Sequence, residues 1–190
     1  MKKYVLLALI LCCSSFWGYA VETYIFATRD TCKLKMDVYR PAHNKHTGTC
    51  VIFAFGGGFR SGSRNSRQNA AFMDSLSKHG LTAIAIDYRL GLKGHTEDFK
   101  SISHTVHRYI TANHIAVEDM YAATLYAYQH AEELGIDRSK ILLCGSSAGA
   151  MTALQCDFEL QQGSERSKVL PQGFRYAGII ALAGAVSRLG

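Results

Sequence analysis

A short run of small residues around two serines is the clearest candidate for chemistry in this sequence. Gly145-Ser146-Ser147-Ala148-Gly149 fits the pattern G-x-S-x-G and directly follows an apolar run at residues 140–144. In this pattern a nucleophilic serine occupies a sharp, strained turn between a strand and a helix, and its neighbours must be small so that the turn can close. The pattern predicts Ser147 as the nucleophile, whereas Ser146, at the x position, should point elsewhere.

A second glycine-rich segment could stabilise the charge that such a nucleophile creates. Gly56-Gly57-Gly58 follows the apolar run of residues 50–55. Attack of a serine on an acyl carbonyl builds an oxyanion, and each backbone N–H aimed at that oxygen contributes about 3 kcal/mol. We expect the donors to be the amides of Gly57, Gly58 and Ala148. A flexible turn is the alternative, and a phosphate loop is disfavoured because no G-K-[ST] follows.

A serine nucleophile also needs a general base and an acid that orients the base. In this arrangement both follow the serine in the chain, the His last. No His lies beyond His130, and the acidic residues after Ser147 all fall in or beside the next expected helix: Asp157, Glu159 and Glu165. Three upstream histidines could substitute, although facing water is their simpler role: His104, His107 and His114. We therefore expect the base and acid to be missing, as in a fragment or a product cut short.

Apolar patterning indicates the elements that would position these groups. A continuous apolar run at residues 50–55 and largely apolar runs at residues 81–86, 140–144 and 176–185 predict buried strands. Helical spacing predicts helices over residues 69–79, 120–134 and 151–158, with Gly135 ending the second. Strands alternating with helices indicate parallel βαβ units in one open α/β sheet with helices on both faces. Residues 91–114 are polar and give no clear prediction.

The chain before these units shows a different pattern. Leu34, Met36 and Val38 alternate with charged residues, which predicts a half-buried strand paired with residues 23–27 in an antiparallel hairpin. Residues 41–49 are expected to form a polar loop. Four cysteines lie outside residues 1–20, and they form no C-x-x-C pair or metal spacing: Cys32, Cys50, Cys144 and Cys156. Zinc is therefore disfavoured, and buried free thiols are expected at Cys50 and Cys144.

Residues 1–20 have the layout of a secretory signal peptide. Lys2 and Lys3 precede an uncharged, largely apolar run, and Gly18-Tyr19-Ala20 suits cleavage after Ala20. The apolar run is too short to span a bilayer comfortably. We therefore expect an exported protein whose residues 21–190 form one domain.

The bulk composition sets the broad class of the protein. The 190 residues are 48% hydrophobic and 19% charged, which suits a packed core and excludes a disordered tail. The formal net charge of +6 includes two signal-peptide lysines, and the basic residues are scattered apart from Arg60, Arg64 and Arg67. A solvated surface is favoured over a nucleic-acid site.

These motifs together resemble one known family. FGGGF (55–59) and GSSAG (145–149), with DYRL (87–90) and GIDRSKILLCGSSAG (135–149), resemble the α/β-hydrolase family over roughly residues 34–186. The resemblance is closest to its carboxylesterase, hormone-sensitive-lipase-like and feruloyl-esterase-like (BD-FAE-like) branch. It implies an α/β-hydrolase fold, incomplete at the C-terminal end.

The resemblance also implies an activity. It is the serine-dependent hydrolysis of small carboxylic esters through an acyl-enzyme, possible substrates including carbohydrate-linked acyl esters, without cofactor or metal. The resemblance also implies structural roles for Asp87 and Asp119. Phe55 stands where the family's glycine motif usually opens with His. A peptidase of the same fold and a non-catalytic exported binding protein are the alternatives.

Overall fold

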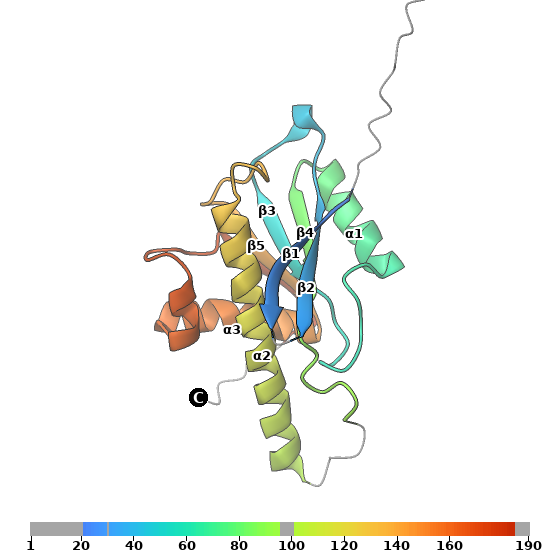
Figure 1. Ribbon diagram of the computed structural model, residues 1–190, viewed down its shortest axis with the longest axis vertical. Helices are drawn as coiled ribbons and strands as arrows, with labels where there is room; N and C mark the ends of the chain where they lie inside the picture. The colour runs from blue at the N-terminus through green and yellow to red at the C-terminus, as the bar shows by residue number, and fades with distance from the viewer. Residues whose placement is uncertain (1–20, 30, 96–100, 185–190) are drawn as a thin grey trace, which may run out of the picture.

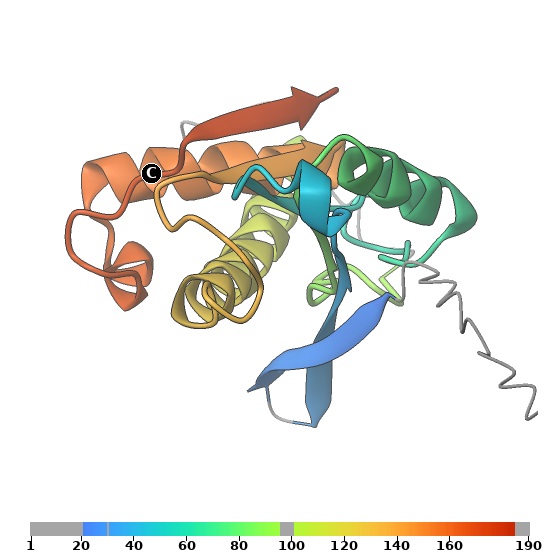
Figure 2. The ribbon, with the colours of Figure 1, turned by 90° about the horizontal axis from the view of Figure 1, so that it is seen from above.

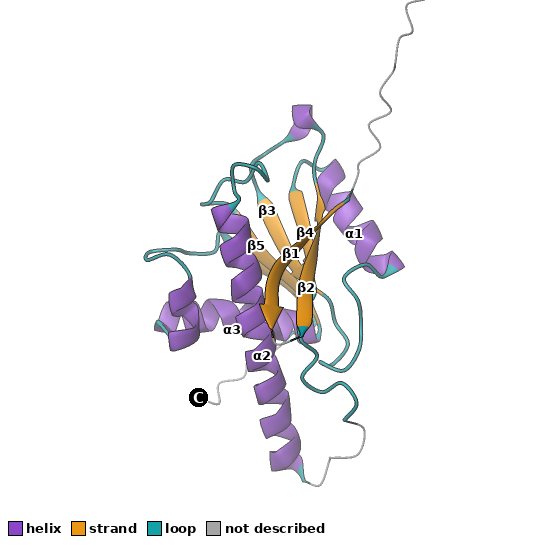
Figure 3. Cartoon of the chain, in the orientation of Figure 1, coloured by secondary structure: helices purple, strands orange, loops and turns teal. Residues whose placement is uncertain are grey.

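A computed structural model describes residues 21–29, 31–95 and 101–184, so the expected signal peptide lies outside the described residues. The described chain forms one sheet with helices packed around it (Figures 1 and 3). The strands are β1 (Glu22–Arg29), β2 (Cys32–Tyr39), β3 (Cys50–Ala54), β4 (Thr82–Ile86), β5 (Ile141–Ser146) and β6 (Gly178–Leu182). The α-helices are α1 (Arg67–Lys78), α2 (Ile102–Gln129) and α3 (Ala148–Gln162). Two short 3-10 helices are η1 (His43–Lys45) and η2 (Glu165–Val169).

The sheet has the strand order β1-β2-β4-β3-β5-β6. β1 and β2 form the expected antiparallel hairpin, with a register shift between Ile25 and Ala27. β2 is also antiparallel to β4, whereas β4, β3, β5 and β6 are mutually parallel neighbours. The predicted open α/β sheet with an antiparallel start is therefore confirmed.

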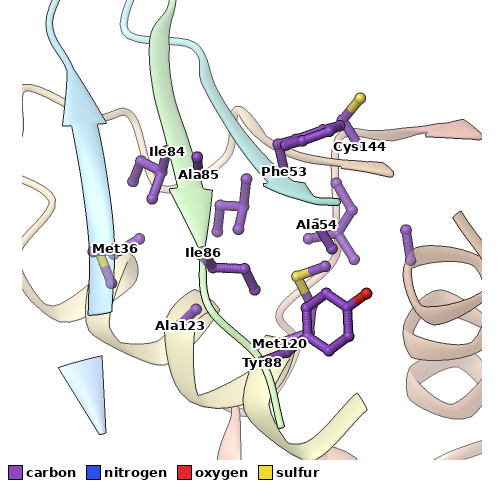
Figure 4. Packing of buried hydrophobic residues seen from close by; sticks show 14 of the residues in the cluster. Met36, Phe53, Ala54, Ile84, Ala85, Ile86, Tyr88, Met120, Ala123 and Cys144 are labelled. Carbon is purple, nitrogen blue, oxygen red and sulfur yellow. The ribbon is translucent and has the colours of Figure 1, made fainter. Parts of the chain in front are cut away.

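Helices cover both faces of this sheet, as the alternating pattern predicted. Phe53 of β3 meets Phe72 of α1 edge to face, with ring centroids 5.5 Å apart. Figure 2 shows α1 on one side of the sheet and α2 with α3 on the other. In Figure 4, Met120 and Ala123 of α2 lie on the side to which Ile86 of β4 points. The central strands are buried on both faces, which explains their continuous apolar runs.

Helix α2 both begins and ends earlier in the chain than the apolar stripe indicated. It begins at Ile102, so most of the polar stretch that gave no prediction forms its first turns, and the Ser101 side chain caps it. It ends at Gln129. The stripe continues to Leu134 because Leu134 is buried in the following turn, which ends at Gly135 with φ +66°.

The prediction of a buried strand over residues 176–185 was wrong in its burial and its length. β6 spans Gly178–Leu182, and its residues Ile180 and Leu182 are 39% and 45% exposed. β6 is one of the two edge strands of the described sheet (Figure 2), and residue 185 lies outside the described chain. An apolar run indicates a strand, but it does not reveal whether another element covers it.

The cysteines match the expectation for the two strand positions. Cys50 and Cys144 are buried free thiols, as is Cys156, while Cys32 is exposed. Burial raises the pKa of the Cys144 thiol to about 11. Within the described chain no helix is both long and apolar enough to cross a membrane. The same residues contain no group of three or more His, Cys, Asp or Glu side chains that could hold a metal ion.

Candidate active site

Ser147 occupies the junction between β5 and α3. β5 ends at Ser146 and α3 begins at Ala148, so a single residue makes the turn. Its backbone has φ +51° and ψ −114°, which is unfavourable for any residue with a side chain. The residue is exposed, and its hydroxyl has no hydrogen-bond partner among the described residues. The G-x-S-x-G segment therefore adopts the strained turn that its pattern predicts.

The glycines of the pattern are required by backbone contacts. A Cβ on Gly145 would lie 2.1 Å from the carbonyl oxygen of Gly149. A Cβ on Gly149 would lie 2.1 Å from the carbonyl oxygen of Ala54, at the end of β3. These distances are far below van der Waals contact, so any side chain would push α3 away from the sheet. The same packing brings the loop after β3 beside the serine, because a Cβ on Gly56 would lie 3.2 Å from the Ser147 Cβ.

The turn is also held from the β6 side and opens toward a helix N-terminus. The Ser147 amide donates to the Leu182 carbonyl at 2.8 Å. Ala148 is the first residue of α3, and the N–H groups of a first helical turn have no intrahelical acceptors. The positive end of the helix dipole therefore lies next to the Ser147 hydroxyl, which favours negative charge there.

The loop after β3 adopts conformations that favour glycine. Gly57, Gly58 and Phe59 have φ values of +134°, +60° and +58°. The Gly57 carbonyl accepts hydrogen bonds from the amides of Arg60 and Ser61, which closes a tight turn. A Cβ on Gly57 would lie 2.0 Å from the Ser61 carbonyl oxygen. Only glycine fits at position 57, so the segment is a defined turn rather than a flexible one.

Aromatic side chains hold this loop from the side of β4. The Tyr88 hydroxyl donates to the Phe55 carbonyl at 2.7 Å, and the two rings stack with centroids 4.5 Å apart. Phe59 is fully buried and meets the rings of Tyr88 and Tyr109 edge to face. The sequence analysis included the DYRL segment in the family resemblance but did not predict that aromatic side chains hold the glycine loop. The signal that could have found them is the aromatic residue on each side of the glycines.

The two aspartates assigned structural roles hold neighbouring segments. Asp87 accepts a hydrogen bond from Arg64 at 2.7 Å, and Arg64 also contacts Asp37 at 3.0 Å. Asp119 is fully buried and accepts bonds from the backbone and the guanidinium of Arg89. Burial raises the pKa of Asp119, although the Arg89 bonds oppose that shift. Both carboxylates are thus engaged by arginines in positions that fit structural roles.

The upstream histidines and downstream acids do not form a base and acid at Ser147 within the described residues. His104 and His107 are exposed on α2. His114 lies 3.8 Å from Glu159, and burial lowers the pKa of its imidazole. Glu159 is in turn bound by Arg166 at 2.8 Å. The other two acids have local partners: Asp157 accepts from Gln161, and Glu165 contacts Lys168.

Two comparisons with known sequences agree with this architecture. The model of the BD-FAE family matches residues 36–184. The sequence is also 31% identical over 139 residues to a protein named acetyl esterase from Salmonella choleraesuis (strain SC-B67). That match covers 73% of this chain and 37% of the relative.

Solved structures give the same picture. Esterase 2 of Thermogutta terrifontis, phosphonylated by sarin, matches with a TM-score of 0.54 and 30% identity, over 70% of this chain and 43% of the other. The same enzyme with butyrate bound matches with a TM-score of 0.53 and 30% identity, over 70% of this chain and 42% of the other. The chain therefore spans less than half the length of these relatives.

Proposed function

The chain belongs to the BD-FAE family of α/β-hydrolase esterases, and from this premise we propose that it hydrolyses carboxylic esters with Ser147 as the nucleophile. One observation carries the proposal. The exposed Ser147 sits on a strained turn between a strand and a helix, and a Cβ on Gly56 would lie only 3.2 Å from its Cβ. That arrangement supports the proposal because acyl transfer requires backbone donors near the nucleophile, and the loop that carries Gly57 and Gly58 passes beside Ser147.

The proposed reaction proceeds in two steps. Ser147 Oγ attacks the ester carbonyl carbon while a general base takes its proton, and the amides of Gly57, Gly58 and Ala148 hold the oxyanion. The intermediate collapses with loss of the protonated alcohol, and the base then activates a water that hydrolyses the acyl-enzyme. We assign the base and its acid to polypeptide outside the described residues, because no described histidine bonds the Ser147 hydroxyl.

The relatives suggest short acyl groups as substrates. One is named acetyl esterase, and the Thermogutta enzyme was solved with butyrate and with propionate bound. We therefore propose small esters with short acyl chains for this protein. The second candidate is a non-catalytic protein of the same fold, which the unpartnered Ser147 hydroxyl favours.

Labelling with a fluorophosphonate tests the nucleophile. In the full-length protein, which includes the polypeptide that supplies the base, we expect the probe to modify Ser147, as located by peptide mass spectrometry, and Ser147→Ala to abolish the modification. Ser146→Ala is the matched control and should still be labelled, because Ser146 ends β5 beside the turn. Equal labelling of Ser147→Ala, or no labelling of the unaltered protein, would refute the assignment.

Turnover tests where the base comes from. We expect residues 1–190 alone to hydrolyse 4-nitrophenyl acetate only weakly, because the described chain places no base at Ser147. Hydrolysis at ordinary esterase rates of about 1–1000 per second would contradict that placement.

Export through the signal peptide is a separate part of the proposal. It rests on the basic, apolar and small-residue segments of residues 1–20. N-terminal sequencing of the exported protein should begin at Val21. Recovery of the intact protein beginning at Met1 would contradict cleavage after Ala20.

A further inference from the structure

Tyr109, on the N-terminal half of α2, presents a hydroxyl to the glycine loop. Its Oη lies 3.7 Å from the position that a Cβ on Gly58 would occupy. Among the described residues this hydroxyl has no hydrogen-bond partner, and it is not sealed from solvent. The hydroxyls of Tyr88 and Tyr121, in contrast, each donate to a backbone carbonyl at 2.7 Å. The Tyr109 hydroxyl is therefore free to bind a molecule from outside.

Rigid elements hold the Tyr109 side chain in this position. Its ring meets the fully buried Phe59 edge to face, with centroids 6.3 Å apart. One turn further along α2, Ala112 packs directly against Gly91, where a Cβ would lie 2.9 Å from the Ala112 Cα. Both contacts fix α2 against the segments that follow β3 and β4. The hydroxyl is thus presented in a defined place, which lowers the entropy lost on binding.

The same geometry sets how far Tyr109 lies from the candidate nucleophile. A Cβ on Gly56 would lie 3.2 Å from the Ser147 Cβ, and Gly58, two residues on, faces Tyr109. Two residues of backbone span at most about 7 Å. With the two Cβ distances and the two Cα–Cβ bonds, this span keeps the Tyr109 Oη within roughly 17 Å of the Ser147 Cβ. A substrate whose carbonyl is at Ser147 and whose chain extends along the glycine loop would therefore meet the Tyr109 hydroxyl with atoms several bonds away from the reacting carbon.

We propose that Tyr109 is a substrate-binding residue that selects esters carrying an ether or hydroxyl oxygen several bonds from the carbonyl. This inference rests on the proposed function and names the substrate class of the same site. The Tyr109 hydroxyl donates a hydrogen bond to that oxygen, and a purely hydrocarbon chain leaves the hydroxyl without this bond. A neutral hydrogen bond of ordinary strength corresponds to about two- to tenfold discrimination.

A pair of fluorophosphonates measures that discrimination in the full-length protein, which includes the polypeptide that supplies the base. One probe carries an oligo(ethylene glycol) chain and the other a hydrocarbon chain of equal length. We expect Tyr109→Phe to slow modification by the ether probe about two- to tenfold and to leave the rate with the hydrocarbon probe unchanged. Tyr128→Phe is the matched control, about 28 Å away along the same helix, and should change neither rate. Equal effects of Tyr109→Phe on both probes, or none, would overturn the inference.

A binding measurement separates this inference from the nucleophile assignment. Ser147→Ala carrying isotope-labelled tyrosine is titrated with diethylene glycol monomethyl ether acetate and, in parallel, with hexyl acetate. The Tyr109 ring resonance, identified by its loss in Tyr109→Phe, should shift saturably with the ether ester only. Failure of the resonance to shift overturns the inference even if Ser147 is labelled. A saturable shift without labelling of the unaltered protein would support Tyr109 and contradict the nucleophile.

Discussion

Replacing Gly149 with Ala sets local helix preference against a tertiary contact. Gly149 is the second residue of α3, where Ala is the better helix former by about 1 kcal/mol. The new Cβ would lie 2.1 Å from the Ala54 carbonyl oxygen and 2.7 Å from that of Phe55, whereas ordinary contact begins at 3.4 Å. Overpacking costs about 1–3 kcal/mol, and a clash with backbone belongs at the upper end. We therefore expect a net loss of about 2 kcal/mol in the free energy of unfolding.

Urea denaturation measures this loss. With a slope of about 2 kcal/mol per molar urea, the midpoint should fall by about 1 M. Gly178→Ala is the matched control: its Cβ would make an ordinary contact with Leu142 at 3.4 Å, so its midpoint should hold or rise slightly. A Gly149→Ala midpoint equal to or above that of the unaltered protein would show that the contact with β3 does not explain the glycine.

Two further substitutions test the supports around the site. Tyr88→Phe keeps the ring stacked on Phe55 but leaves the buried Phe55 carbonyl without its donor, so the free energy of unfolding should fall by about 1–3 kcal/mol; an unchanged urea midpoint would contradict this. Although burial raises the pKa of Glu159, hydrogen bonds from Arg166 and Gln155 hold it below its ordinary value overall. Its stabilisation is thus complete above about pH 4.3 and lost as pH falls through the lower folded pKa. In Glu159→Gln the urea midpoint should fall less on acidification than it does in the unaltered protein. An identical dependence of the midpoint on pH in both proteins would contradict the role given to the Glu159 carboxylate.

The sequence predicted much of the fold because its central strands are buried on both faces. A strand in that position must be apolar throughout, so residues 50–55, 81–86 and 140–144 were recognisable. The start of α2 at Ile102 was not recognisable, since its first turns are mostly exposed and polar. Such turns lack the apolar stripe on which helix prediction depends.

The candidate site was likewise predictable only in part from the sequence. Local chemistry made the turn at Ser147 and the glycine loop predictable, because both motifs are contiguous and each has a steric requirement. The roles of Tyr88 and Tyr109 were not predictable. They come from segments distant from the loop in sequence, and only folding brings their hydroxyls to Phe55 and Gly58.

The sequence alone determined which backbone positions must be small and which runs must be strands, because those constraints act between neighbours along the chain. Only the tertiary structure decided how these pieces meet. It placed Gly149 against β3, left β6 at the exposed edge of the described sheet, and set Tyr109 over the glycine loop. Such contacts join residues far apart in sequence, and their geometry depends on the packing of whole helices against the sheet.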